Sequence, residues 1–222
     1  MNNMTKKKTD NKEQGIDNLI DSLSDDLTPV NKLAHPALRV LPWVLIALVY
    51  MTGVLHFLGI RMDISEKLGE TLFLYEMLLT LGIGLTSAYA AGWLSVPDMG
   101  ERPWLLAIPT ALFAAFATLI GCTIICNGLD TPKIDWHHCF SDTLLMGFIP
   151  MVLLLILVRK GATTKPYWMS FMCVLSSGSL AWAAIRMSCM SDRIGHNMVF
   201  HFLPFIVLAL VFSALARKIY RW

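Results

Sequence analysis

Two short polar stretches between long apolar runs contain most of the groups that could bind a metal ion or react with an oxidant. The first, residues 126–142, contains His137, His138 and Cys139 in succession. The second, residues 186–198 with the residue just beyond it, adds further candidates: Cys189, Asp192, His196 and His201. Thiolates and imidazoles bind zinc, copper and similar ions, and an accessible thiol can be oxidised or can pair with a second thiol. The two stretches therefore predict a metal site or a thiol switch, with Asp192 and the histidines as possible ligands or supporting groups.

Cys139 and Cys189 lie in different polar stretches, so a disulfide or a shared metal ion would tie two parts of the chain together. The total of five cysteines is odd, which excludes a complete set of internal disulfides. The spacing matches no established zinc motif. Three interpretations remain open: a sensor built on these thiols, a structural disulfide with histidines at a membrane interface, or neither.

The composition indicates an integral membrane protein. Hydrophobic residues make up 55% of the 222 residues and charged residues 15%, whereas ordinary globular chains have about 25% charged residues. So few charges could not cover the surface of a water-soluble fold. The formal net charge of +2 is also too small to favour direct nucleic-acid binding.

Six apolar runs follow a polar N-terminal region, and each is near the roughly 20 residues that a helix needs to cross a bilayer. Backbone amides in lipid must be satisfied within their own segment, so these runs predict helices. The sequence thus predicts an all-α integral membrane bundle over residues 42–222, preceded by a short cytoplasmic tail with a helical segment over residues 1–41. The predicted spans are Pro42–Ile60, Leu72–Val96, Trp104–Ile125, Thr143–Val158, Tyr167–Ile185 and Met198–Ala216.

The distribution of lysine and arginine predicts the orientation of these spans, because basic residues concentrate on the cytoplasmic side. The tail, the loops after the second and fourth spans, and the C-terminal end together carry 13 of them, and the opposite side carries 5. Both termini are therefore predicted to be cytoplasmic. The cysteine and histidine stretches are predicted to face outward.

The tail contains apolar residues at helical spacing, with aspartates elsewhere on the same helix. Such a short helix is marginal by itself in water, so its apolar stripe needs a partner. The partner could be a protein or the inner leaflet of the membrane. Acidic residues dominate the polar face and the inner leaflet is anionic, which favours a protein. The predicted partner-binding residues are Ile16, Leu19, Ile20, Leu23 and Leu27.

Other chemically notable residues lie inside the predicted spans. Glu76 is costly at its depth in a membrane, and Arg186 is a possible partner at a similar depth, although snorkelling to the interface is an equal alternative. Cys122 and Cys126 are four residues apart on one helical face, which favours ordinary packing. Cys173 is expected in the core.

The sequence has no Gly-rich phosphate loop, no His-Glu-x-x-His and no Gly-x-Ser-x-Gly motif. We therefore expect a protein that is not an enzyme. Two competing classes stay open. A membrane thiol–disulfide oxidoreductase linked to a quinone would use Cys122, Cys126, Cys139 and Cys189. A small metal transporter would need polar groups near mid-membrane, where the spans have few. Neither an oxidoreductase nor a transporter would need an acidic helix with a stripe of leucines before the first span.

Several segments together resemble the NrsF-type anti-sigma factors, a family of six-span proteins of the bacterial inner membrane. They are Leu19–Val30 in the tail, Leu94-Ser95-Val96-Pro97 after the second span, His201-Phe202-Leu203-Pro204, and the closing Arg217–Trp222. The resemblance extends from about Asp17 to Trp222.

This resemblance implies that the tail sequesters an extracytoplasmic-function (ECF) sigma factor, which is released when a stress outside the cell acts on the loops. Heavy-metal or oxidative stress is the usual signal in the family, so a transition-metal ion is a possible effector. Cys139 and Cys189 match by position the family's extracytoplasmic cysteines. The chain departs from the family at His137-His138 and at Met190-Ser191-Asp192, which leaves the identity of the signal open.

Overall fold

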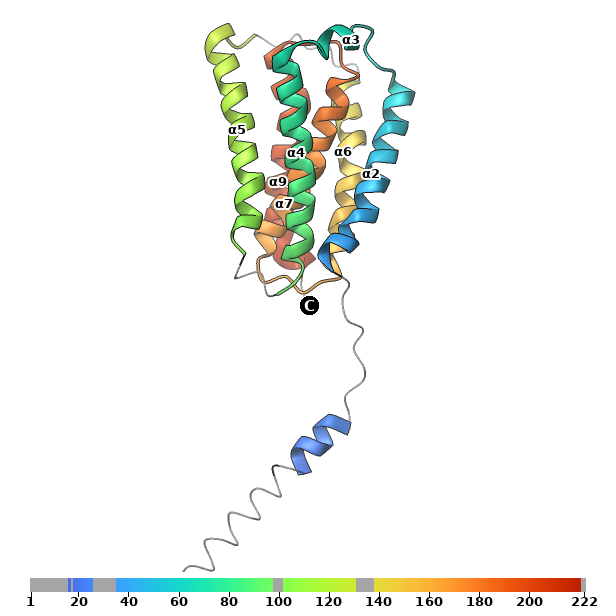
Figure 1. The fold of residues 1–222 in the computed structure, drawn as a ribbon, viewed down its shortest axis with the longest axis vertical. Coiled ribbons are helices and arrows are strands. Elements are labelled where there is room, and N and C mark those ends of the chain that lie inside the picture. The colour runs from blue at the N-terminus through green and yellow to red at the C-terminus, as the bar shows by residue number, and fades with distance from the viewer. Residues whose placement is uncertain (1–15, 17, 26–34, 98–101, 131–137, 221–222) are drawn as a thin grey trace, which may run out of the picture. The chain divides into compact units, whose positions relative to one another are not determined.

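A computed structural model describes residues 16, 18–25, 35–97, 102–130 and 138–220, whose regular secondary structure is entirely helical. The chain divides into two units, residues 1–33 and 34–222. In the first unit, residues 18–25 form a short helix with exposed side chains (Figure 1).

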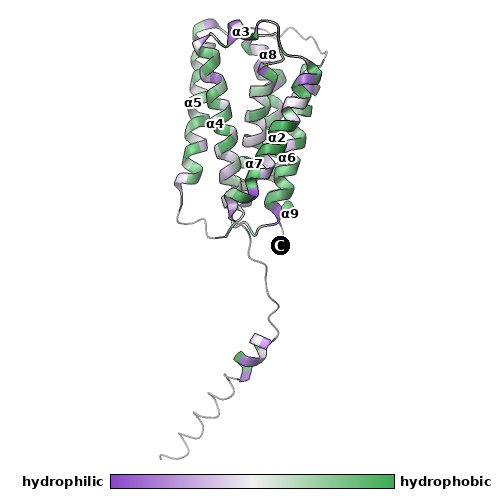
Figure 2. Ribbon diagram, turned by 45° about the vertical axis from the view of Figure 1, so that its right-hand side comes forward, coloured by the Kyte–Doolittle hydropathy of each residue, from purple (hydrophilic) through white to green (hydrophobic). Residues whose placement is uncertain are grey.

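The second unit is a bundle of six helices that are long and apolar enough to cross a membrane. The predicted all-α bundle of six transmembrane helices is thus confirmed. Figure 2 shows hydrophobic residues along most of the length of the helices and hydrophilic residues concentrated near their ends. The elements are α2 (Pro36–Leu58), α3 (Ile64–Lys67), α4 (Thr71–Leu94), α5 (Trp104–Asn127), α6 (Cys139–Arg159), α7 (Pro166–Arg186), α8 (Ile194–Asn197), η2 (Met198–Phe202) and α9 (Leu203–Ile219).

The first span begins at Pro36 and not at the predicted Pro42. His35 is the N-cap residue, and its Nδ1 accepts a hydrogen bond from the Ala37 backbone N–H. Pro36 occupies the first helical turn, where its missing N–H costs nothing. The helix then continues through Pro42, so the basic Arg39 belongs to it.

The central helix of the bundle is α7, which packs against α4, α6 and α9 and has most of its residues buried. Small residues allow this close packing. A Cβ atom on Gly84 of α4 would lie 2.6 Å from Leu180 Cγ of α7. Ser176 Oγ donates a 2.7 Å hydrogen bond to the Gly84 carbonyl and fastens the same two helices together. By contrast, α5 lies at one side of the bundle against α4 (Figure 1).

The last span contains a wide helical turn, η2, between α8 and α9. The Leu203 N–H donates to the Met198 carbonyl five residues back, which defines a π-helical turn. Pro204 follows and has no N–H to continue the regular ladder. The turn contains His201, whose side chain is fully buried.

The connections at one end of the bundle carry the chemically notable residues. We call this end the thiol end; it comprises residues 59–70, residues 187–197 and Cys139. At the opposite end, Arg39 donates hydrogen bonds to Ser95 Oγ (3.0 Å) and to the Leu157 carbonyl (3.2 Å). Arg39 therefore joins α2 to the ends of α4 and α6.

Candidate thiol and imidazole site

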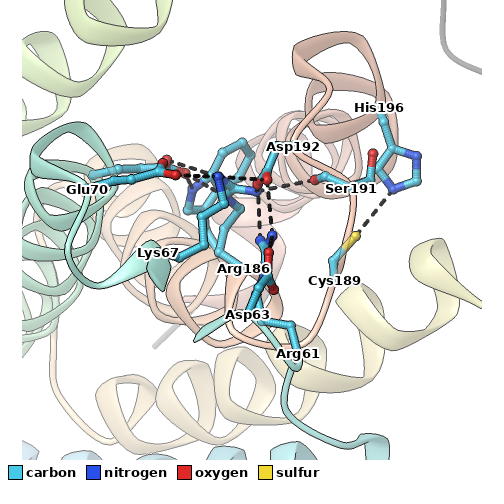
Figure 3. Close-up of polar contacts among 11 residues, drawn as sticks. Arg61, Asp63, Lys67, Glu70, Arg186, Cys189, Ser191, Asp192 and His196 are labelled. Atoms are coloured by element: carbon cyan, nitrogen blue, oxygen red, sulfur yellow. Dashed lines mark hydrogen bonds and ion pairs between the residues drawn. The ribbon is translucent and has the colours of Figure 1, made fainter. Parts of the chain in front are cut away.

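Three potential metal ligands converge at the thiol end. Cys139 is the first residue of α6, Cys189 lies in the loop after α7, and His196 lies in α8. One ligand atom from each lies within 4.8 Å of the other two. Cys189 Sγ is 3.6 Å from His196 Nε2 (Figure 3). Three separate elements thus bring two thiols and an imidazole together, and we call this set the thiol–imidazole group.

His201 borders the thiol–imidazole group. Its ring centroid lies 5.2 Å from that of His196. Thr143 Oγ1 donates to the Cys139 carbonyl at 2.7 Å and lies 2.6 Å from His201 Nδ1. A hydroxyl has one hydrogen, so His201 Nδ1–H must donate to Thr143. The Nε2 atom of His201 is also buried.

The Cys189 thiol is shifted toward its ionised form. Hydrogen bonding from Cys139 lowers the pKa of Cys189, burial acts in the opposite direction, and hydrogen bonds from His201 and from the Ser191 backbone add to the lowering. The thiolate is the form that attacks electrophiles and binds metals. All five cysteines are free thiols. The pair can therefore react with an oxidant or bind a metal without first breaking a disulfide.

The donor set fits a soft or borderline metal ion. Two thiolates and an imidazole are typical ligands of Zn²⁺ and of related ions such as Cd²⁺ and Cu⁺. In closed structural sites, Zn²⁺ takes four ligands in a tetrahedral arrangement. The Nε2 atom of His201 is a candidate for the fourth once it carries no proton, because the contact of Nδ1 with Thr143 would hold the ring in the required tautomer.

Asp192 lies outside the thiol–imidazole group, and its predicted role as a possible ligand or supporting group stays a prediction. Its two carboxylate oxygens accept hydrogen bonds or ion pairs from Arg61, Lys67 and Arg186 at 3.0–3.1 Å (Figure 3). Burial acts to raise the pKa of Asp192, but hydrogen bonds from Arg61 and Lys67 and the charge of Arg186 hold it below its usual range. Three cations occupy the carboxylate, so it acts as their common counterion.

The structure brings Glu76 and Arg186 together in the interior. Arg186 Nε donates to Glu76 Oε1 at 3.0 Å, and Trp182 Nε1 donates to the same oxygen at 2.6 Å. Both members of the ion pair are buried within the protein. Arg186 links Glu76 in α4 to Asp192 beside the thiol–imidazole group.

The partners of these residues were not predicted from the sequence. Arg61, Lys67 and Thr143 carry no local pattern that points to Asp192 or His201, because the contacts are long-range. Trp182 had one weak signal: it lies four residues before Arg186, and residues at that spacing share a helix face.

The remaining predicted residues are distributed as follows. His138 is exposed and precedes α6 with a φ of 140°, while His137 lies outside the described residues. Cys173 is buried, as expected. The packing expected for Cys122 and Cys126 is wrong, because both are exposed on α5. They face outward since α5 packs on the bundle mainly through α4.

In the tail, the apolar side chains predicted to bind a partner are exposed in the described helix. They are Ile16, Leu19, Ile20 and Leu23, and Leu23 retains 61% of its surface. Leu27 lies outside the described residues. No other described residue of the tail's own unit buries this stripe.

The sequence model of the NrsF family, described as negative regulator of sigma F, matches residues 23–222. No curated protein and no solved structure matches the chain. The match covers the six helices, the thiol end and the last part of the tail helix.

Proposed function

This chain belongs to the NrsF family of negative regulators of sigma F, and from that premise we propose that it is a membrane-bound anti-sigma factor with an ECF sigma factor as its partner. The tail holds the sigma factor at the bacterial inner membrane. Metal or oxidative stress in the periplasm acts on Cys139 and Cys189, and the sigma factor is then released. The observation that carries this proposal is the convergence of both thiols and His196 at one end of the bundle.

The tail is the proposed binding element for the sigma factor. Its exposed apolar stripe, centred on Leu19 and Leu23, has the i, i+4 spacing of helices that dock in an apolar groove. Burying such a stripe on a partner offsets the cost of ordering a short helix. Aspartates on the polar face stay in solvent.

The thiol–imidazole group is the proposed sensor. A soft metal ion would bind the thiolates of Cys139 and Cys189, with His196 as a further ligand. Alternatively, an oxidant would accept two electrons and two protons as the two thiols form a disulfide. Either event draws the start of α6 and the loop after α7 together. A signal shifts the equilibrium only through its different affinity for the two states.

The asymmetry of basic residues, 13 against 5, supports a cytoplasmic tail and a periplasmic thiol end. The thiol end itself holds Arg61, Lys67 and Arg186 in ion pairs with acidic residues. Their charge is therefore largely neutralised.

The competing thiol oxidoreductase has less support. That activity would pass electrons among four thiols, but Cys122 and Cys126 are exposed on α5 and do not belong to the thiol–imidazole group. The family description also names a regulator and not an enzyme.

Co-purification of the full chain from its native membranes tests the proposal. We expect a sigma factor to co-purify, and Cd²⁺ or the oxidant diamide to reduce its yield at least fivefold. Leu23→Asp should abolish co-purification without either reagent. Ser24→Asp adds the same charge on the polar face and should retain the sigma factor. Absence of any sigma factor from wild-type preparations would refute the proposal.

The sensor is tested separately from the tail. Cys139→Ser combined with Cys189→Ser should keep the sigma factor bound when Cd²⁺ or diamide is added. The matched control, Cys122→Ser combined with Cys126→Ser, should respond like the wild type. A normal response in the first double variant would remove these thiols from the mechanism.

A further inference from the structure

The loop that carries Cys189 is attached to the end of α2. The Arg61 backbone N–H donates to the Met187 carbonyl at 2.9 Å. Ser188 Oγ donates to the Gly59 carbonyl at 2.8 Å. Gly59 ends α2 with a φ of 91°, a conformation that favours glycine. A shift of this loop would therefore pull directly on the thiol end of α2.

The helix that begins at Cys139 is attached to α2 along its length. Tyr50 Oη donates to the Leu145 carbonyl at 2.8 Å, and Trp43 Nε1 donates to the Pro150 carbonyl at 2.8 Å. Arg39 adds the bond to α6 at the opposite end of the bundle. The three donors are spaced by four and seven residues, so they lie on one face of α2. Side chains of α2 thus hold the backbone of α6 at three levels.

We propose that α2 transmits the state of the thiol–imidazole group to the tail, with Trp43 and Tyr50 as the positioning residues that couple α2 to α6. The inference rests on the proposed function and deepens it. Both cysteine-bearing segments contact α2, and α2 is the helix that follows the tail in the chain. A helix moves as a unit, so a displacement of 1–2 Å, about the size seen in helix-shift switches, can reach its far end.

The opposite end of α2 lies close against α4. A Cβ atom on Gly92 would lie 2.5 Å from Val40 Cγ2 and 3.3 Å from the Pro36 carbonyl oxygen. This contact leaves no room for a side chain. The position of the Pro36 end of α2 therefore depends on Gly92, and a larger residue there must push α2 aside.

Hydrogen exchange of the full chain in lipid nanodiscs tests the transmission without a sigma factor. Adding Cd²⁺ to the wild type should change exchange at least threefold in α6 and in α2, and leave α5 unchanged. Trp43→Phe combined with Tyr50→Phe removes both donors and keeps an aromatic ring at each position. In this double variant the change in α6 should persist and the change in α2 should disappear.

The matched control is Tyr167→Phe combined with Trp168→Phe, two exposed side chains at the start of α7. It should behave like the wild type. The transmission role is overturned if Cd²⁺ changes the exchange of α6 but not of α2 in the wild type. It is also overturned if the exchange of α2 still changes in the Trp43/Tyr50 variant. If Cd²⁺ changes neither helix, the metal sensor is overturned, and transmission is decided by the next variant.

Gly92→Leu acts on α2 without the sensor. We expect it to reduce co-purification of the sigma factor at least fivefold in the absence of Cd²⁺ or diamide. Gly53→Leu, on α2 itself, is the control, because a Cβ atom there meets nothing within 4 Å. Wild-type retention of the sigma factor by Gly92→Leu, with normal yield of folded protein, would overturn the proposal. Failure of the wild type to bind any sigma factor would refute the proposed function instead, and hydrogen exchange would still decide the role of α2.

Discussion

Asp192 and Arg61, which lie 131 residues apart in the sequence, form a bidentate ion pair. Arg61 Nη1 donates to Asp192 Oδ1 and Arg61 Nη2 donates to Asp192 Oδ2, both at 3.0 Å. This parallel geometry is the strongest arrangement of a guanidinium and a carboxylate. The Arg61 side chain is only 1% exposed, whereas that of Asp192 is 39% exposed. The pair therefore fixes the loop of Cys189 to the connection between α2 and α4.

Asp192→Asn should destabilise the thiol end. It removes the shared counterion of Arg61, Lys67 and Arg186. Removing one partner of a fully buried pair costs about 3–5 kcal/mol. Asp192 is partly screened by solvent, and Arg61 still has Asp63 as a partner. We therefore expect a loss of about 1–2 kcal/mol in the free energy of unfolding. Thermal unfolding in detergent measures it. Asp130→Asn, at an exposed carboxylate, is the control and should leave the midpoint within error of the wild type.

The same pair has a defined pH dependence. The pKa of Asp192 is held below its usual range, so its contribution is complete above the unfolded-state pKa of about 3.9 and is lost as the pH falls through the folded-state pKa. The difference in unfolding free energy between wild type and Asp192→Asn should stay constant from about pH 5 to 8 and shrink below about pH 4. Unfolding measured across this range checks it. A difference that changes between pH 5 and 7 would point to another titrating group.

The sequence was sufficient to predict the six helices because long apolar runs have few alternatives in a membrane. It failed at the start of α2, which was predicted at Pro42 but lies at Pro36. In the structure, Arg39 finds Ser95 and the Leu157 carbonyl, contacts that no local pattern indicates. The ion pairs of Asp192 were not predicted for a similar reason. A carboxylate near a cysteine is equally consistent with a metal ligand and an ion pair, and its cationic partners are far away in the sequence.

Glu76→Gln should destabilise the bundle more than Asp192→Asn does. Glu76 is buried and accepts hydrogen bonds from both Trp182 and Arg186. The amide removes the negative charge that neutralises Arg186 inside the span, although Asp192 remains as a second partner. We expect a loss of about 2–4 kcal/mol of unfolding free energy. Chemical or thermal unfolding in detergent measures it.

Two further variants separate the charge from the packing at Glu76. Glu70→Gln changes an exposed carboxylate of the same helix region that pairs with Lys67, and should alter stability by less than about 1 kcal/mol. Glu76→Gln combined with Arg186→Met should be less damaging than the sum of the two single changes, because the pair is lost together. Strict additivity would contradict a direct interaction.

Cys139→Ala should make Cys189 less reactive at low pH. Hydrogen bonding from Cys139 is the largest cause of the lowered pKa of Cys189. Without it, the burial of Cys189 remains and favours the neutral thiol. The midpoint of the pH dependence of iodoacetamide labelling at Cys189 should move upward by at least one pH unit. Labelling followed by peptide mass spectrometry measures the midpoint, and Cys122→Ala should leave it unchanged. An unchanged midpoint in Cys139→Ala would show that Cys139 does not lower the pKa of Cys189.

Gly147→Ala should lower the stability of the bundle, whereas Gly121→Ala should leave it unchanged or raise it. A Cβ atom on Gly147 would collide with the Phe205 ring, which also lies against Gly178 and so has no room to move. Overpacking a core typically costs about 1–3 kcal/mol, which outweighs a gain of about 1 kcal/mol in helix propensity over glycine. A Cβ atom on Gly121 meets nothing within 4 Å, so only the gain remains. Thermal unfolding should show a lower midpoint for Gly147→Ala and an equal or higher one for Gly121→Ala. A higher midpoint for Gly147→Ala would mean that α6, α7 and α9 pack less tightly around Phe205 than the structure shows.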